Sequence, residues 1–192
     1  MSEQKEHKYN LNQDEKKALL TIARCALERA VIGTQKEIPH YDMPVLDEKR
    51  GVFVTIHNRG ELRGCIGYVV GKRPLKETVE EMAQAAALRD SRFKPVTASE
   101  LSEIDLEISV LSPLREIKDV NEIEVGTHGL MIRAGMYSGL LLPQVAVEHN
   151  WDRETFLEYT CMKAGLYKDA WKDENVSLSV FSAQVFSEKD MF

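Results

Sequence analysis

Cysteine is scarce in this 192-residue chain, which contains three cysteines and no Cys-x-x-Cys pair. The odd number and the spacing exclude a disulfide framework and a zinc ribbon, so free thiols in a reducing compartment fit best. Long hydrophobic runs are also missing, because no apolar stretch approaches the ~20 residues that a membrane span requires. The chain begins with MSEQKEHK, which is charged where a signal peptide would be apolar. We therefore expect a cytoplasmic protein with no membrane partner.

The chain also lacks an excess of positive charge, since its formal net charge is -6 at pH 7. Broad electrostatic capture of nucleic acid usually needs a clustered basic face, so this balance argues against a nucleic-acid partner. The histidines show no metal-ligand spacing, and neither a Gly-x-Ser-x-Gly elbow nor a cofactor fingerprint occurs. We predict neither a metal nor a cofactor.

What is present is the composition of an ordinary soluble globular protein, with 43% hydrophobic and 29% charged residues. The length suits one sizeable core and is short for two independent domains. We expect a single domain over residues 1–192, with residues 1–10 as a flexible N-terminal tail.

Helix signals occur in three segments. Asn12 and Glu15 resemble a capping box, and apolar residues then recur at helical spacing. The predicted helices begin at Asn12, Pro74 and Asp152 and end at Gly33, at about Leu88 or Arg89, and at Gly165.

Strand signals lie between and after these helices. Residues 104–111 alternate apolar and polar side chains, which is the period of a strand with one buried face. The other predicted strands cover residues 52–57, 61–70, 130–132, 139–142 and 176–186. The last of them should return to the sheet. The pattern predicts an α+β fold, with an antiparallel-rich mixed sheet and helices packed on one face.

The segment Leu62–Gly67 (LRGCIG) is unusual for a strand because it contains two glycines. Glycine weakens a strand interior, so Gly64 and Gly67 indicate a bulge or a close approach by something else. A three-residue turn at 58–60 would pair His57 with Glu61, Thr55 with Arg63 and Phe53 with Cys65. Cys65 and Arg63 would then share a polar face with His57 and Glu61, and Leu62, Gly64 and Ile66 would face the core.

In this arrangement Arg63 lies about 7 Å from Cys65 along the strand, near enough to favour a nucleophilic thiolate. His57 would lie about 13 Å away, so a histidine base would have to be His128 or His149 from elsewhere. The alternative interpretation is structural: Cys65 is a small half-buried residue and Arg63 a solvated one.

A second cluster of charge precedes the predicted Pro74 helix, where free amides and the helix dipole favour an anion. It consists of Arg63, Lys72, Arg73 and Lys76. An anionic small molecule is one possible ligand, and a solvated basic loop is the alternative. A phosphate loop of the Walker type is excluded, because Arg73 stands where Ser or Thr should hold magnesium.

Several segments together resemble the AMMECR family, whose microbial members are called AmmeMemoRadiSam system protein A. They are Leu62–Gly67, Asp90–Phe93, Ile108–Pro113, His128–Leu130, Leu141–Ala146 and Cys161–Leu166. One departure is Ser91, since the family commonly has proline there. The resemblance implies an α+β fold of two intimately packed lobes and a biochemical activity that is not established. It also implies a pathway shared with a Memo-like protein and a radical S-adenosylmethionine enzyme.

The family motif carries Arg63, Gly64, Cys65 and Gly67 as the expected functional positions. Possible neighbours from other segments are Asp90, Arg92, His128 and Gln144. Each of these four also has a structural interpretation. Asp90 and Arg92 can pair with each other, His128 can lie in a turn, and Gln144 can cap the chain after Pro143.

Two hypotheses follow. In the first, the protein is a binding or scaffold component that docks a partner, such as the Memo-like protein, or a small ligand at Leu62–Gly67. In the second, it is an enzyme that presents Cys65 as a nucleophile in a glycine-lined cleft. We favour the first, because spacing pairs no second catalytic residue with Cys65.

Overall fold

The computed structural model describes residues 9–35 and 37–191, so most of the predicted N-terminal tail lies outside the described residues. Contacts within the chain define two compact units. The first unit combines Met1–Leu111 with Gln184–Phe192, and the second consists of Ser112–Ala183. The prediction that the whole chain is one domain stays a prediction.

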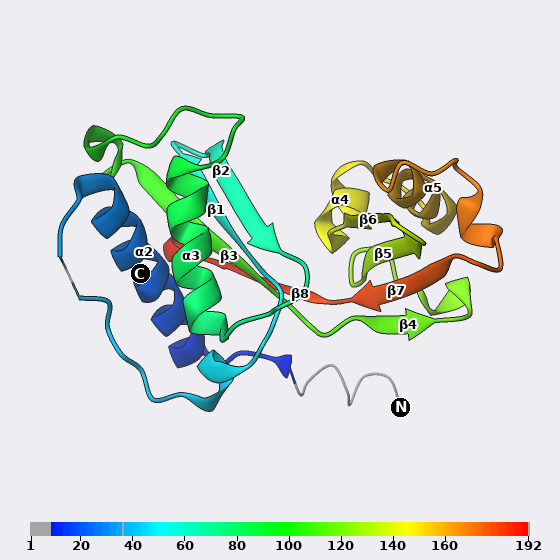
Figure 1. The fold of residues 1–192 in the computed structure, drawn as a ribbon, viewed down its shortest axis with the longest axis horizontal. Coiled ribbons are helices and arrows are strands. Elements are labelled where there is room, and N and C mark those ends of the chain that lie inside the picture. Colours follow the sequence, from blue (N-terminus) through cyan, green and yellow to red (C-terminus); the bar gives the residue numbers. More distant parts are fainter. Residues whose placement is uncertain (1–8, 36, 192) are drawn as a thin grey trace. The chain divides into compact units, whose positions relative to one another are not determined.

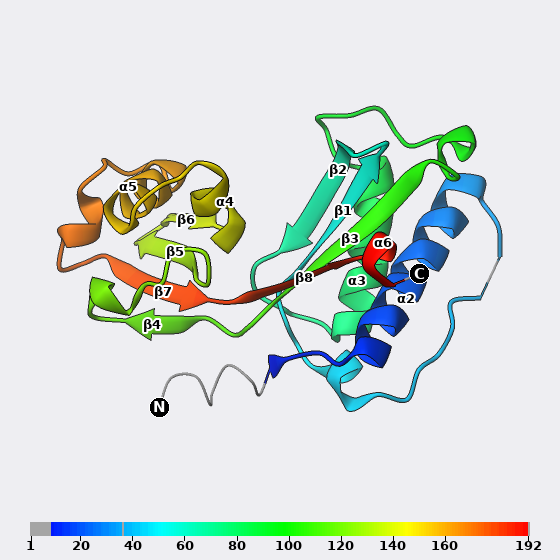
Figure 2. The same cartoon turned by 180° about the vertical axis from the view of Figure 1, so that it is seen from behind.

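The first unit contains a four-stranded sheet with helices on one face (Figures 1 and 2). Its strand order is β2 (Glu61–Tyr68), β1 (Val52–Asn58), β3 (Ile104–Leu111) and β8 (Ala183–Ser187). Its helical segments are α2 (Gln13–Ile32), η2 (Pro44–Asp47), α3 (Leu75–Leu88), η3 (Ala98–Glu100) and α6 (Glu188–Met191). Figure 1 shows α2 and α3 in front of the strands, and Figure 2 shows the strands from behind.

The boundaries of α2 follow the sequence signals. The Asn12 side chain accepts from the Glu15 amide, and the Glu15 side chain accepts from the Asn12 amide, which completes the predicted capping box. Gly33 ends the helix with φ 75° in the left-handed region. The second predicted helix is also confirmed, since α3 ends at Leu88.

The core of the first unit lies between these helices and the sheet. Side chains from α2, α3, β1 and β3 have almost no exposed surface there. The largest of them are Leu19, Leu20, Leu27, Ile56, Leu75, Met82, Leu106 and Ile108. The face predicted as buried in residues 104–111 is confirmed, because Ile104, Leu106, Ile108 and Val110 all belong to this core. The opposite face is not uniformly exposed, since Ser109 and Leu111 are buried as well.

The register predicted for the β1–β2 hairpin is wrong. The loop has two residues, Arg59 and Gly60, both with positive φ, so Asn58 pairs with Glu61. The register then shifts between Ile56 and His57, which leaves Arg63 as the extra residue of a bulge. Beyond this bulge Cys65 pairs with Thr55 instead of Phe53, and Phe53 pairs with Gly67.

The bulge also changes which residues face the core. Leu62 pairs with His57 and is 45% exposed, whereas the simple alternation placed it inside. Gly64 is buried, as predicted, and Cys65 lies on the opposite face of the sheet. The presence of a bulge beside these glycines is therefore confirmed, although the detailed pairing was not predicted.

The second unit contains the other sheet and a core of its own. Its strand order is β4 (Arg115–Ile117), β7 (Ser177–Phe181), β5 (Gly129–Ala134) and β6 (Tyr137–Leu141). Its helical segments are η4 (Val120–Glu122), α4 (Pro143–Glu148), α5 (Arg153–Lys163) and η5 (Ala170–Lys172). The predicted N-cap of α5 is confirmed, because Asp152 accepts from the Thr155 amide. The side chains of α5 that pack in this core include Phe156, Leu157 and Cys161.

The α+β fold class is confirmed, but the strands form two sheets where one was expected. The extended segment predicted at 176–186 is interrupted at Ser182, so β7 belongs to one sheet and β8 to the other. Every strand pair whose register is described is antiparallel. Among the described residues, no helix is both long and apolar enough to cross a bilayer.

Candidate functional site

Cys65 lies on β2, the terminal strand of the first sheet. The Cys65 amide donates a hydrogen bond to Oδ2 of Asp90 at 2.9 Å. The carbonyl oxygen of Cys65 accepts one from Nη2 of Arg92 at 3.2 Å. An acidic and a basic side chain thus bind the outward-facing backbone groups of an edge strand at one residue.

Asp90 and Arg92 also bind each other, as the structural interpretation of this pair predicted. Nη2 of Arg92 lies 2.6 Å from Oδ2 of Asp90, and the Arg92 amide donates to Oδ1 at 3.1 Å. The Arg92 hydrogen bond, helped by the Cys65 and Arg92 amides, holds the pKa of Asp90 well below its ordinary value. Asp90 is buried, whereas the Arg92 side chain is 55% exposed. The Asp90 carboxylate is therefore a fixed anion that positions Cys65.

The turn that presents Asp90 and Arg92 forms without the proline that the family commonly has at Ser91. The Phe93 amide donates to the Asp90 carbonyl at 3.1 Å, which closes the turn. The Arg92 guanidinium lies 5.4 Å from the centroid of the Phe93 ring. Asp90 and Arg92 are thus held in a hydrogen-bonded turn with serine between them.

Arg63 is directed away from Cys65 and binds the segment that follows α3. Its Nε donates to Oε1 of Glu100 at 2.7 Å, and Nη1 donates to the Lys94 carbonyl at 2.8 Å. The bond from Arg63 lowers the pKa of Glu100 from 4.5 to about 2. The Arg63 side chain is only 16% exposed, so its main contacts are inside the protein.

The sequence analysis did not identify Glu100 as a partner of Arg63. A local signal for it exists, because Thr97 and Glu100 have the spacing of a capping box and form one here. The Thr97 amide donates to Oε2 of Glu100 at 2.8 Å. This signal predicts the turn but contains no information about the distant arginine.

The Cys65 thiol lies on the face opposite the helices and is partly buried. Oγ1 of Thr55 donates a hydrogen bond to Sγ of Cys65 at 3.3 Å. The other two cysteines, Cys25 and Cys161, are buried, and burial raises the pKa of the Cys161 thiol. All three are free thiols, and Cys65 is the most accessible of them.

The two motif glycines are in contact with the protein itself. A Cβ atom on Gly64 would lie 2.3 Å from the carbonyl oxygen of Ala86 in α3. A Cβ atom on Gly67 would lie 2.4 Å from the Phe53 ring. The close approach predicted at these positions is therefore made by α3 and by Phe53. Their assignment as binding residues stays a prediction.

A groove of about 390 Å³ opens at the turn end of the same hairpin. It is lined by Asn58, Arg59, Glu61, Leu62 and Arg63. Leu62 supplies an exposed apolar side chain, and Glu61 is an exposed acid. The Arg59 side chain is 75% exposed and pairs with Glu103. The start of the motif thus borders a mixed apolar and charged depression.

The basic cluster predicted before α3 is largely neutralised by the chain. Lys76 lies 2.7 Å from Asp47, and Arg73 lies 3.4 Å from Glu81. Arg63 pairs with Glu100, as described above. The helix start is also occupied, because the Leu75 amide donates to the Glu48 carbonyl at 2.8 Å. These contacts favour the alternative interpretation of a basic loop without a ligand, because acidic side chains of the same chain pair with its basic residues.

His128 and Gln144 belong to the second unit. His128 is buried, and its Nδ1 accepts from the Glu124 amide at 3.1 Å, in agreement with the turn predicted as its structural role. Gln144 is partly buried near the start of α4, directly after Pro143. The six other predicted site residues lie in the first unit, where Cys65, Asp90 and Arg92 form one bonded cluster.

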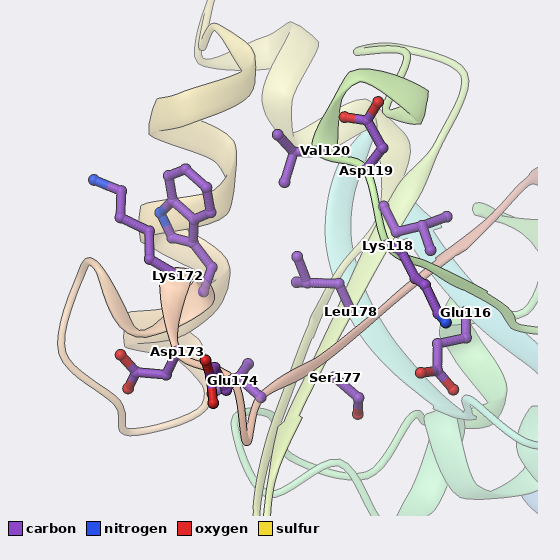
Figure 3. A pocket seen from close by; sticks show the side chains of 12 residues that line it. Glu116, Lys118, Asp119, Val120, Lys172, Asp173, Glu174, Ser177 and Leu178 are labelled. Carbon is purple, nitrogen blue, oxygen red and sulfur yellow. The ribbon is translucent and has the colours of Figure 1, made fainter.

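The second unit has a groove of its own, with a volume of about 540 Å³ (Figure 3). Residues 116–120 line one part of it, and residues 171–174 and 176–178 line another. None of the predicted site residues is among its lining side chains. Among residues 9–35 and 37–191, no three His, Cys, Asp or Glu side chains gather in a way that could hold a metal ion.

Comparison with known proteins identifies relatives over most of the chain. The AMMECR1 family model matches residues 20–186. A protein of Methanothermobacter thermautotrophicus is 44% identical over 185 residues, which cover 93% of this chain and 96% of that protein. A protein of Sulfolobus acidocaldarius is also 44% identical, with 93% and 84% of the two chains covered.

A solved structure supports the same assignment. The crystal structure of an uncharacterised protein from Pyrococcus horikoshii matches with a TM-score of 0.80 and 41% identity. The match covers 90% of this chain and 91% of that one. The similarity in sequence and in fold thus extends over nearly the full length of both chains, and the protein belongs to the AMMECR1 family.

Proposed function

We propose that this protein is a binding component that docks a partner protein at Leu62–Gly67. The partner proposed is the Memo-like protein of the pathway that the family resemblance implies, in which a radical S-adenosylmethionine enzyme also acts. The observation that carries the proposal is the groove at the hairpin end, which is bordered by the exposed Leu62 side chain. A depression beside this side chain gives a partner a place to cover apolar surface and remove it from water.

The contacts of the motif support binding because they give the strand a fixed shape. Asp90 and Arg92 hold both backbone groups of Cys65, and Glu100 holds Arg63. A surface that is already rigid loses little conformational entropy when a partner binds. The guanidinium of Arg92, which binds the Cys65 carbonyl of β2, is about half exposed. It can therefore make a charged contact at the rim of an interface with the partner.

The test is the affinity of the purified protein for the Memo-like protein encoded in the same genome, measured by isothermal titration calorimetry. We expect Leu62→Asp to weaken binding at least about tenfold, because it places a charge where an apolar anchor packs. Cys65→Ser should leave the affinity unchanged. Val185→Asp is the matched control, since Val185 is also 45% exposed but lies on β8.

Two results would overturn this proposal. One is the absence of binding by the unmodified protein. The other is an equal loss of affinity in Leu62→Asp and Val185→Asp, which would indicate a general effect of surface charge. Circular dichroism on each variant establishes that the fold is intact before the affinities are compared.

A second function, an enzyme with Cys65 as nucleophile, is favoured by one contact. The Thr55 hydroxyl donates to Sγ, and a donor of this kind stabilises a thiolate. Alkylation of the intact protein, followed against pH for each cysteine by peptide mass spectrometry, tests this function. Rapid reaction of Cys65 at neutral pH that slows in Thr55→Val supports it. Reaction no faster than that of the buried Cys25 excludes it.

A further inference from the structure

Arg50 is a buried arginine just before β1, in the first unit and outside the Leu62–Gly67 segment. It is only 3% exposed. Its Nε donates to the Leu111 carbonyl at 3.1 Å, which uses one of its three nitrogens. Nη1 and Nη2 are both buried, and neither has a hydrogen-bond partner among residues 9–35 and 37–191. Most of the donors of a charged group are therefore unsatisfied.

Burial of unsatisfied guanidinium nitrogens is unfavourable for an arginine. Removal from water lowers the pKa of Arg50, but a guanidinium stays protonated in proteins and cannot avoid the cost by becoming neutral. Buried charges are normally paired, and an orphaned buried donor calls for an explanation such as a bound ion or water. The other partly buried arginines of this unit have acidic partners, since Arg24 pairs with Glu188 and Arg63 with Glu100.

The charged side chains that act on Arg50 are acidic: Glu48 and Glu15 oppose the lowering of its pKa by burial, but neither occupies Nη1 or Nη2. Gly71 packs against the backbone of Arg50, and a Cβ atom on Gly71 would lie 2.2 Å from the Arg50 backbone nitrogen. The basic residues Lys72 and Arg73 follow directly. The Arg73 side chain is 65% exposed and lies 3.4 Å from Glu81, as described above.

An aromatic ring lies over the guanidinium. The centroid of the Tyr9 ring lies 5.9 Å from the guanidinium carbon of Arg50. The Gln184 side chain holds this segment, because it donates to the Tyr9 carbonyl at 2.6 Å and accepts from the Leu11 amide at 2.8 Å. The cover is therefore attached by two hydrogen bonds to one amide side chain.

We propose that Arg50 binds a compact oxyanion, a phosphate or a carboxylate group, at Nη1 and Nη2 beneath the Tyr9 ring, and that Tyr9 moves aside to admit it. The planar fork of a guanidinium matches two oxygens of such a group, and Nη1 and Nη2 are the nitrogens that supply the donors. The site is separate from the docking segment, so its test does not depend on the proposed function.

The experiment is thermal unfolding of the full chain in increasing inorganic phosphate, with sodium chloride adjusted to keep the ionic strength constant. We expect a saturable rise in Tm, because a ligand that binds only the folded state stabilises it by mass action. Malonate, titrated separately, distinguishes a carboxylate site from a phosphate site. Phosphate also stabilises proteins without binding a site, but that effect does not saturate.

The matched variants are Arg50→Gln and Arg59→Gln, which remove the same charge. Arg50→Gln should weaken the apparent affinity by about ten- to hundredfold, the range expected for lost charged hydrogen bonds. Arg59→Gln should keep the response, because Arg59 is exposed and pairs with Glu103. A saturable rise of equal midpoint in both variants overturns the proposal, as does the absence of a saturable rise with either anion in the unmodified protein.

Arg50→Gln also loses the bond to Leu111, so it can fail to fold. Arg50→Lys then provides the comparison, because it keeps the charge but cannot present a fork. It should bind the anion more weakly than the unmodified protein. Tyr9→Ala should retain the saturable response and bind faster in stopped-flow mixing, since the cover is gone. Loss of the response in Tyr9→Ala would overturn the assigned role of Tyr9.

Discussion

Arg63 and Arg92 come from two segments of the family resemblance, and their side chains make different contacts. Arg92 binds Asp90 and the Cys65 carbonyl and remains half exposed. Arg63 binds Glu100 and two backbone carbonyls and is mostly buried. The Arg63–Glu100 pair fixes the segment after α3 to the hairpin, so its contribution should be measurable as stability.

We expect Glu100→Gln to destabilise the protein at neutral pH and to have less effect in acid. The pKa of Glu100 is lowered from 4.5 to about 2, which corresponds to on the order of 3 kcal/mol. Because the folded value is depressed, this stabilisation is present above pH ~4.5 and is lost as the pH falls towards 2. Urea denaturation at several pH values should show the two proteins converging in this window.

The control for this prediction is Glu61→Gln, which neutralises an exposed acid of the same hairpin. It should change the free energy of unfolding by no more than about 0.5 kcal/mol at pH 7. A constant difference between the unmodified protein and Glu100→Gln from pH 7 to pH 2 would contradict the assigned ion pair.

At the scale of elements, the close packing of β2 against α3 explains why the strand contains Gly64. The helix backbone at Ala86 occupies the space where a side chain would lie. On the outer side of β2, Asp90 and Arg92 bind the backbone of Cys65. Such capping reduces the tendency of an edge strand to pair with another chain.

We expect Gly64→Ala to lower the free energy of unfolding by about 1–3 kcal/mol, the usual cost of overpacking a core. The added Cβ atom would lie 2.3 Å from a backbone oxygen, which cannot move without shifting α3. Urea denaturation measures the change. Cys65→Ala, at the next residue, removes a side chain without a clash and should cost less. Equal stability of Gly64→Ala and the unmodified protein would refute the close approach.

The sequence predicts the helices better than the hairpin, for a physical reason. Caps such as Asn12 and Asp152 act within four residues, so local signals determine them. The bulge at Arg63 depends on a turn with Arg59 at positive φ, an uncommon conformation that alternation does not reveal. One extra residue was enough to expose Leu62 and to give Cys65 a different partner.

In the candidate site, too, contacts between residues that are distant in sequence could not be predicted from local sequence signals. Asp90 and Arg92 were expected near Cys65 only through the family resemblance, and they form its bonded cluster. Thr55 became the partner of Cys65 through the shifted register. The isolated guanidinium of Arg50 has no sequence signal, because its burial depends on segments far apart in the chain.

At the scale of the whole molecule, the first unit is discontinuous in sequence. The second unit is inserted between Leu111 and Gln184, and the final segment Gln184–Phe192 returns to the first unit. This short segment supplies Phe186 to the first core and Glu188 to Arg24. The stability of the first unit should therefore depend on the last residues of the chain.

We expect Phe186→Ala to lower the free energy of unfolding by about 3–5 kcal/mol, because it empties a core position that is only 2% exposed. Chemical denaturation of the full chain measures this loss. Val185→Ala is the control, since Val185 is 45% exposed and lies on the same strand. A small effect of Phe186→Ala would show that β8 contributes little to the first core.

The inserted position of the second unit also has a consequence for synthesis on the ribosome. Domains usually fold in the order in which they are made, starting from the N-terminus. Here the residues of the second unit are complete when Ala183 has been added, whereas the first unit still lacks β8. The nascent chain must therefore keep one edge of β3 unpaired until β8 has been synthesised, so the first unit is completed after the second unit that is inserted into it.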